Sequence, residues 1–424
     1  MNDARVYPGA GLKAASAWTR ENLSWLLLLS CLVLFTTKTK FNLPIAIMTL
    51  AGLFVLIRHF REVVGHPGLR WFMLLFASIV VPMLLSLVDA VNPGRAAAST
   101  AKYLVFPLVL VYVLHAVGTG DSEQFRHRLF LGFGIIVSAW VLDGLLQYLV
   151  GYDLLGYPYE GGRVRGVFHP KHRLGTVSAA LSPVFFDFVR RYGRRYKPVW
   201  LLAPAIVTVV VLAASRTAWM MLLVSIFLYA VYLALRFGTR KVVKWTGVFL
   251  LVAAVISVAA YQVPHVKRYV DTTALMFKGD FKSIDQATAF RLSLWQTAYH
   301  MIRGNPVNGI GPRGFRYVYR EYAPKGNMWK SQTHPHQMTL EILVETGMIG
   351  LLGYLLFWVL LFRFLLRLPR ERIEATVPWG LAAMVAAFPL NAHMAFYANY
   401  WSTITWWLLI IMVAMASTYK PAAK

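Results

Sequence analysis

Two histidines flank a proline just before an apolar run in SQTHPHQMTLEILVETG, residues 331–347. Pro335 keeps His334 and His336 out of a helix interior, because proline cannot donate the backbone hydrogen bond of the helical ladder. The next residues, QMTLEILVETG, have the apolar spacing of a helix. We therefore expect His336 at a helix N-terminus, where unpaired N–H groups favour a neutral imidazole and a nearby anion. A neutral imidazole is suited to general-base catalysis.

Arginine is the residue type that suits a phosphate ligand, because its planar guanidinium makes bidentate hydrogen bonds and stays protonated. Arg216 lies in VLAASRTAWMMLLV, where two apolar runs meet with almost no loop between them. If these runs are membrane spans, the guanidinium is held at or just inside the membrane surface. A charge there is energetically costly and usually has a partner. The alternatives to phosphate binding are contact with lipid head groups and a structural pair with Asp89 or Asp143.

Three further arginines map to the same side of the membrane as Arg216. Arg291 leads the helical pattern RLSLWQTAYHMI, and Arg163 and Arg165 lie in GGRVRGVFHPKHRLG. Taken alone, Arg291 would indicate no more than a solvated helix face. Several guanidinium groups that converge are what a diphosphate site requires, so these four are the candidate diphosphate ligands.

Metal and carboxylate chemistry fit the sequence less well. The pair His334 and His336 could bind zinc, with His169 and His172 as further ligands, but no Cys or carboxylate set stands nearby at metal-site spacing. The acids on the side of the membrane that carries these arginines are dispersed along the sequence. A two-carboxylate hydrolase needs a pair of acids and a Mg²⁺-dependent transferase needs acids that hold the metal, so both are disfavoured. We expect neither a metal nor a cofactor.

Other polar residues have structural explanations. GIGPRG, residues 309–314, follows no strand and is interpreted as a turn rather than a phosphate loop. Asp143 and Gln147, one turn apart, are interpreted as an internal polar patch. Glu341 and Glu345 are expected to orient nearby arginines or the histidine.

The elements that position these residues are predicted to be membrane spans. Of 424 residues, 58% are hydrophobic and 14% charged, and the mean hydropathy is +0.54, which indicates an all-α polytopic membrane protein. Apolar runs near the roughly 17–25 residues that cross a hydrocarbon core recur, and we expect about twelve. They lie at 22–37, 42–58, 70–88, 101–118, 129–150, 174–190, 199–215, 218–235, 244–262, 347–366, 377–393 and 400–418.

The charge distribution orients these spans. The net charge of +25 is divided among short loops such as 58–70, 190–197, 236–244 and 363–372 rather than gathered on one soluble domain, which argues against nucleic acid and for a lipid bilayer. If the spans alternate, these loops and both termini are cytoplasmic. The chain then divides into nine spans within 1–262, a segment of short helices at 263–346 on the side opposite the cytoplasm, and three spans within 347–424.

The combination resembles the O-antigen ligase and polymerase superfamily, most closely the O-antigen ligases of the WaaL type. The resemblance covers about residues 70–365 and is strongest in NPVNGIGPRGF and THPHQMTLEILVETGMIGLLG. His336 matches the histidine thought to act in catalysis in that family, and Arg216 and Arg291 match arginines implicated in activity. Gln337 and Lys171 stand where the family usually has Asn, with His334 and Gln337 as supporting residues.

The resemblance implies a glycosyltransferase that moves O-polysaccharide from undecaprenyl diphosphate to lipid A–core at the periplasmic face of a Gram-negative inner membrane. The diphosphate is already a good leaving group, so arginines without a metal suffice, and His336 as base predicts a single inverting displacement. We expect a monomer.

Three alternatives remain open. A polymerase that lengthens the lipid-linked glycan, or a transferase that glycosylates protein Ser or Thr, would use the same donor. A flippase for anionic lipids is a different class, and it would need cations through the depth of the bundle.

Overall fold

The chain folds into long helices because its apolar runs satisfy their backbone hydrogen bonds internally, as a bilayer requires. A computed structural model describes residues 22–239, 247, 254–324, 329, 331–392 and 394–417. The first half contains the helix Asn22–Leu34 and α2 (Asn42–Arg58), α3 (Phe60–Gly65), α4 (Pro67–Leu85), α5 (Pro93–Ala101), η1 (Lys102–Leu104), α6 (Val105–Thr119), α7 (Ser122–Val150), η2 (Gly166–Phe168) and α8 (Leu174–Gly193). The second half contains η3 (Lys197–Leu201), α9 (Leu202–Leu212), α10 (Arg216–Phe237), α12 (Pro264–Ala274), η4 (Leu275–Lys278), α13 (Phe281–Ala287), α14 (Leu292–Gly304), α15 (Phe315–Tyr322), α16 (Met338–Leu366), α17 (Ile373–Ala386) and α18 (Asn399–Ala416).

Six described helices are long and apolar enough to cross a membrane, so the all-helical membrane class is confirmed while the count of twelve stays a prediction. They are Pro67–Leu85, Pro93–Thr119, Ser122–Val150, Arg216–Phe237, Met338–Leu366 and Asn399–Ala416. Four more apolar helices, among them Lys197–Leu212 and Ile373–Ala386, are shorter. Of the span expected at 244–262, residues 244–246 and 248–253 lie outside the described residues.

One end of the bundle gathers the basic loops. Arg236, at the end of α10, pairs with Glu374 at the start of α17 at 3.1 Å, and Arg372 pairs with Glu123 at the start of α7 at 3.1 Å. Three loops that are far apart in the chain therefore meet here. We call this the basic-loop end.

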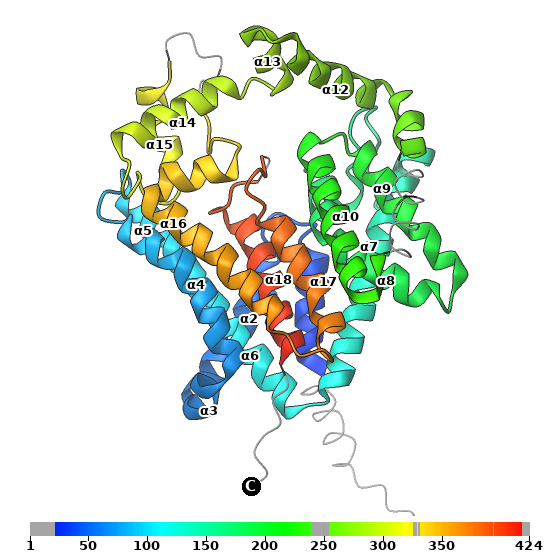
Figure 1. Ribbon diagram of the computed structural model, residues 1–424, viewed down its shortest axis with the longest axis vertical. Helices are drawn as coiled ribbons and strands as arrows, with labels where there is room; N and C mark the ends of the chain where they lie inside the picture. Colours follow the sequence, from blue (N-terminus) through cyan, green and yellow to red (C-terminus); the bar gives the residue numbers. More distant parts are fainter. Residues whose placement is uncertain are drawn as a thin grey trace, which may run out of the picture.

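Both ends of the described chain lie at the basic-loop end. Arg126 Nη2 donates to the carbonyl of Ser417 at 2.6 Å, and Arg128 donates to the side chain of Asn22. Figure 1 shows both ends at the bottom of the view.

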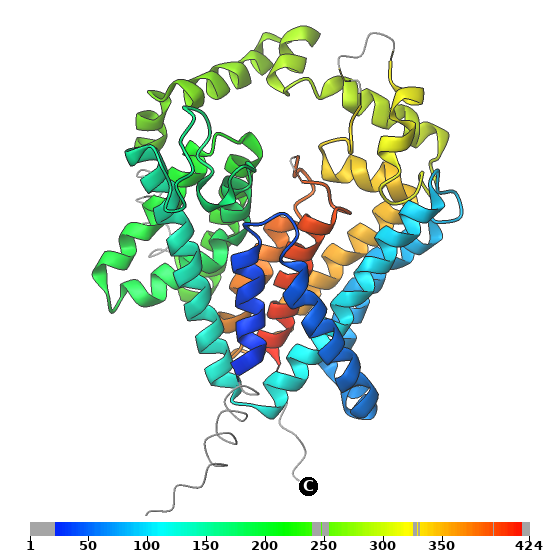
Figure 2. The same cartoon turned by 180° about the vertical axis from the view of Figure 1, so that it is seen from behind.

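The opposite end carries the segment 263–337. Here α12 and α13 form an arch that joins the half of the molecule containing α7 to α10 with the half containing α14 to α16, as Figures 1 and 2 show from two sides. We call this the arch end. The described part of this segment forms short helices, and its place over the membrane stays a prediction.

A kink in α16 fixes the arch end to the bundle. Gly347 has φ 62° and ψ −159°, which divides α16 into two helical segments. The N–H groups freed by the kink donate to a loop inserted beside it: Met348 N to Pro306 O at 2.9 Å and Ile349 N to Val307 O at 3.2 Å. The two strongest motifs of the sequence, NPVNGIG and ETGMIG, are thus in direct contact.

Candidate functional site

Three of the four predicted arginines converge at the arch end, and two of them contact Tyr269 of α12. Arg163, from the loop after α7, donates to the Tyr269 hydroxyl, and its guanidinium carbon lies 4.9 Å from the ring centroid. The guanidinium carbon of Arg216 lies 5.6 Å from the same centroid. A tyrosine face attracts cations, so the ring holds two like charges close together.

Arg291, the third arginine, lies just before α14 and is close enough to interact electrostatically with the other two. Burial lowers the pKa of Arg291, and the positive charges of Arg216 and Arg163 lower it further. Within the part of the chain that the structure describes, no carboxylate lies within salt-bridge distance of any of the three. We call Arg163, Arg216 and Arg291 the arginine cluster.

Arg216 is positioned by the tight turn predicted between the two apolar runs. Ser215 caps α10, its hydroxyl accepting from Ala218 N at 3.4 Å, so Arg216 is the first helical residue. Its guanidinium donates to the carbonyl of Ala287 at the end of α13. The side chain therefore joins α10 to the arch.

Neither carboxylate considered as a pair for Arg216 takes that role. Asp89 Oδ2 accepts from Asn308 Nδ2 at 2.6 Å. Asp143 accepts from the backbone N–H groups of Leu154 and Val167, each at 2.8 Å.

The polar pair on α7 anchors the loop 151–173. Besides the two bonds to Asp143, Gln147 Oε1 accepts from Arg165 N at 2.9 Å and Gly166 N at 2.8 Å. The side chain of Arg165 pairs with Glu160 at 2.8 Å, so of the four candidates Arg165 alone has a carboxylate partner in the described structure. Because α7 holds the loop backbone, Arg163 is presented to Tyr269 from a fixed support.

The two histidines lie immediately before α16, as Pro335 and the apolar spacing after it indicated. Their ring centroids are 4.0 Å apart, and Thr333 Oγ1 lies 2.9 Å from His334 Nδ1. His334 is buried and His336 half-buried. His336 has φ 53°, so the backbone turns sharply at the residue before the helix cap.

Gln337 is the cap of α16, which explains why His336 is at the helix end. Its side-chain oxygen accepts from Leu340 N, and its Nε2 donates to Pro389 O at 3.1 Å. Met338 N donates to Asn391 O at 2.9 Å. The histidine segment is thereby fastened to the segment between α17 and α18.

The acids in the first turns of α16 orient an arginine that the sequence analysis did not select. Glu341 Oε1 lies 3.5 Å from Arg313 Nη1, and Glu345 Oε2 accepts from Arg313 N at 2.6 Å. Arg313 belongs to GIGPRG, which is a turn, as predicted. The sequence signal for this arginine was the pair Glu341 and Glu345, which we expected to orient nearby arginines or the histidine. Their partner Arg313 lies in the separate segment 309–314, which the spacing within α16 does not indicate.

Metal ligands do not gather among the residues that could be searched. No group of three or more His, Cys, Asp or Glu side chains comes together in the described ranges. The zinc alternative with His169 and His172 therefore gains no geometric support.

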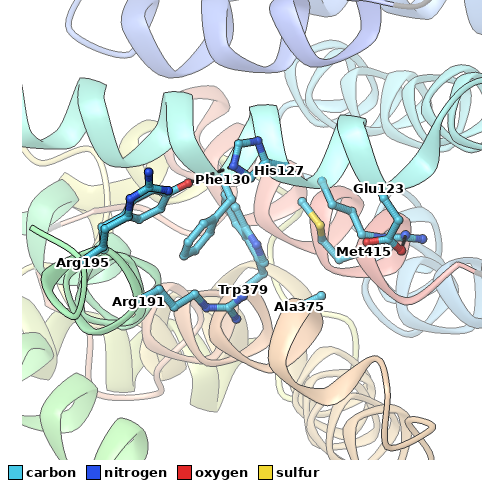
Figure 3. Close-up of a pocket in the computed structure, with 10 residues that line it drawn as sticks. Glu123, His127, Phe130, Arg191, Arg195, Ala375, Trp379 and Met415 are labelled. Carbon is cyan, nitrogen blue, oxygen red and sulfur yellow. Dashed lines mark hydrogen bonds and ion pairs between the residues drawn. The ribbon is translucent and has the colours of Figure 1, made fainter.

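A cavity of about 390 Å³ lies at the basic-loop end, away from all of these residues. Figure 3 shows side chains from α7, α8, α17 and α18 around it. Two of its three arginines have acid partners: Arg126 contacts Glu123 at 2.6 Å and Arg191 contacts Asp187 at 2.7 Å, while Arg195 is the third. Because most of this positive charge is compensated, the cavity is a weaker candidate for an anionic substrate than the arch end.

Comparison with known families bears on the same segments. Residues 199–355 match the family model of the O-antigen ligases, Wzy_C. This region is similar to the O-antigen ligases. The match supports its place in the O-antigen ligase and Wzy-like family, and no curated protein matches the chain.

The region that matches the family model contains most of the candidate site. Arg216, Arg291, His334 and His336 lie within the matched range, as do the interlocked NPVNGIG and ETGMIG segments. Arg163 lies outside it and reaches the site through Tyr269, which lies inside.

Proposed function

We propose that this chain is an O-antigen ligase that transfers polysaccharide from undecaprenyl diphosphate to a sugar hydroxyl of lipid A–core, at the periplasmic face of the Gram-negative inner membrane. The observation that carries the proposal is the arginine cluster: three guanidinium groups without a described carboxylate partner converge from three segments, at the end of the molecule that bears the histidine pair. The family match supports the reaction class.

The arginine cluster would bind the donor diphosphate. In the reaction the bond between the anomeric carbon and the phosphate oxygen breaks, and negative charge develops on the leaving diphosphate. Guanidinium groups already fixed by Tyr269 and Ala287 stabilise this charge without reorganising. A hydrogen bond to a charged group contributes about 1.5–3 kcal/mol, so the cluster can act without a metal ion.

His336 would take the proton of the acceptor hydroxyl as its oxygen bonds to the anomeric carbon. Its place just before the N-terminus of α16 favours the neutral imidazole that this role requires. One base and one leaving group give a single displacement with inversion. General-base catalysis contributes about 10²–10⁴-fold in rate.

The test is transfer by purified protein in detergent with undecaprenyl-diphosphate glycan, lipid A–core and EDTA. We expect wild type to form the conjugate and His336→Ala to lose about 10²–10⁴-fold in rate. His300→Ala is the matched control, because His300 is an exposed histidine of α14 at the same end. His334→Ala separates the two histidines, and a larger loss in that variant would transfer the role of base to His334.

Other products would identify the alternatives. A lengthened donor glycan without conjugate would indicate a polymerase, and glycosylated protein would indicate a protein transferase. Loss of all activity in EDTA, restored by a divalent cation, would contradict the metal-independent mechanism. Folded protein that only moves the donor between leaflets would indicate a flippase.

A further inference from the structure

A second group of cations lies at the arch end, separate from the arginine cluster. Arg95 is in the first turn of α5, Lys102 begins η1, Arg316 is in the first turn of α15, and Arg313 lies in the turn just before α15. Arg95, Lys102 and Arg313 line one small cavity together with Ser99, Tyr103, Ser402 and Asn399. We call this the second cation cavity.

The cavity has room for a group the size of phosphate. Its volume is about 70 Å³, and about 10–15 Å³ of such space holds one water molecule. It therefore accommodates about five atoms of the size of a water oxygen. The cations around that space match the acceptor oxygens of a phosphate group.

Arg313 is held rigidly at the cavity wall. It is 6% exposed, its N–H donates to Glu345 Oε2 at 2.6 Å, and its guanidinium lies 3.5 Å from Glu341. Glu341 also accepts from the backbone of Phe396 at 2.8 Å and Tyr397 at 3.4 Å. A cation fixed in this way binds an anion without losing side-chain freedom.

The positive charges of this region exceed the negative charges. Four cations lie near two carboxylates, Glu341 and Glu345, and none of Arg95, Lys102 and Arg316 has a salt-bridge partner among the described residues. Burial lowers the pKa of Arg316, and the charges of Arg313 and Arg95 lower it further. Like charges gathered in this way are stabilised when an anion binds between them.

The cavity shares its support with the histidine segment. Gln337 and Met338 bind the carbonyls of Pro389 and Asn391, and Glu341, one turn further along α16, binds the backbone of Phe396 and Tyr397. Tyr397 and the next two residues line the cavity. A group held in the cavity is therefore positioned by the same helix turns that position His336.

We propose that the second cation cavity binds a phosphate group of the glycolipid that accepts the glycan. This inference rests on the proposed function, in which donor and acceptor are both lipid-anchored. The arginine cluster takes the donor diphosphate, and the second cation cavity takes the acceptor phosphate. Two anionic substrates are thereby bound at separate places on one face, with the histidine segment fastened to the acceptor place.

The kinetic test compares phosphorylated acceptor glycolipid with the same glycolipid after phosphatase treatment. For wild type we expect the KM to be at least tenfold lower for the phosphorylated acceptor. The double variant Arg95→Gln/Lys102→Gln should remove this preference and leave the KM for the donor unchanged. Lys38→Gln/Lys40→Gln is the matched control, because it removes the same charge from exposed residues at the same end.

Three results would overturn the proposal. An increase in donor KM would assign the cavity to the donor diphosphate. A preference for the phosphorylated acceptor that survives in the double variant would place its phosphate elsewhere. An equal loss of binding to phosphatidylglycerol vesicles and to the acceptor would identify a general phospholipid site.

A binding measurement separates this proposal from the proposed function. Equilibrium binding of the two glycolipids to purified protein in detergent needs no turnover. Phosphate-dependent binding that Arg95→Gln/Lys102→Gln abolishes, in protein without ligase activity, would support the cavity and refute the function. Ligase activity with equal binding of both glycolipids would support the proposed function and refute the role of the second cation cavity.

Discussion

The guanidinium of Arg216 donates a hydrogen bond to the carbonyl of Ala287, which joins the first residue of α10 to the last residue of α13. One side chain therefore both fastens the arch and belongs to the arginine cluster. A planar guanidinium can donate in more than one direction, whereas a lysine ammonium is a point charge. Arg216 thus fastens the arch, and the role that we propose for it beside this is to bind the donor diphosphate.

Arg216→Lys should keep the charge but lose the fork that bridges Ala287 and a phosphate. Removing a charge-assisted hydrogen bond costs about 1.5–3 kcal/mol, so we expect kcat/KM for the donor to fall by roughly 10–100-fold. Steady-state transfer at varied donor concentration measures it. Arg268→Lys is the control, since Arg268 is exposed on α12 next to Tyr269. Unchanged kinetics in Arg216→Lys would contradict a role of Arg216 in binding the donor and would leave only its structural contact with α13.

Gly347→Ala should destabilise the protein. Gly347 adopts a φ/ψ combination open almost only to glycine, and an added Cβ would lie 2.1 Å from Val307 O. Such strain costs about 1–3 kcal/mol before the contact with the inserted loop is counted. We expect a lower Tm in detergent, measured by intrinsic fluorescence. Gly65→Ala, where an added Cβ meets nothing within 4 Å, should leave Tm nearly unchanged, and equal Tm values for both variants would refute the account of the kink.

Gln337→Ala should loosen the start of α16. The substitution removes the cap on Leu340 and the bond to Pro389, and loss of an N-cap costs about 1 kcal/mol. Gln337→Asn restores the capping group, and the shorter amide should recover the Tm in part or in full. Hydrogen exchange at the first turn of α16 measures the effect. Exchange as slow in Gln337→Ala as in wild type would show that the other contacts suffice.

The loop 151–173 should make stability depend on pH. Desolvation of the His172 ring lowers its pKa to about 4, and the charges of Arg163 and Arg165 add to this effect. Between the ordinary value of about 6.5 and about 4, the unfolded chain gains a proton that the folded chain does not. The free energy of unfolding should therefore fall as the pH falls through this window, by an amount reduced because His172 is exposed and water screens its charge.

His172→Gln tests that dependence. The variant should lose less Tm than wild type between pH 6.5 and pH 4, while His300→Gln follows the wild-type curve. Parallel curves for His172→Gln and wild type would show that other groups dominate acid destabilisation.

Local features of the sequence determined much of this structure. Pro335 and the apolar spacing after it placed His336 at the start of a helix, and the junction of two apolar runs placed Arg216 at a tight turn. These features follow from backbone chemistry within a few residues, which composition and spacing display directly. The glycine-rich stretch 309–314 was likewise correctly predicted as a turn.

Tertiary packing decided the rest. Three features depend on which distant segments meet. Arg163 and Arg216 share Tyr269, while Arg165 pairs with Glu160. The NPVNGIG segment contacts the kink at Gly347, and Glu341 orients Arg313. Spacing along one helix cannot specify such meetings, because they follow from how whole helices pack against each other. The sequence supplied the charged groups and their local frames, and packing determined which of them share a site.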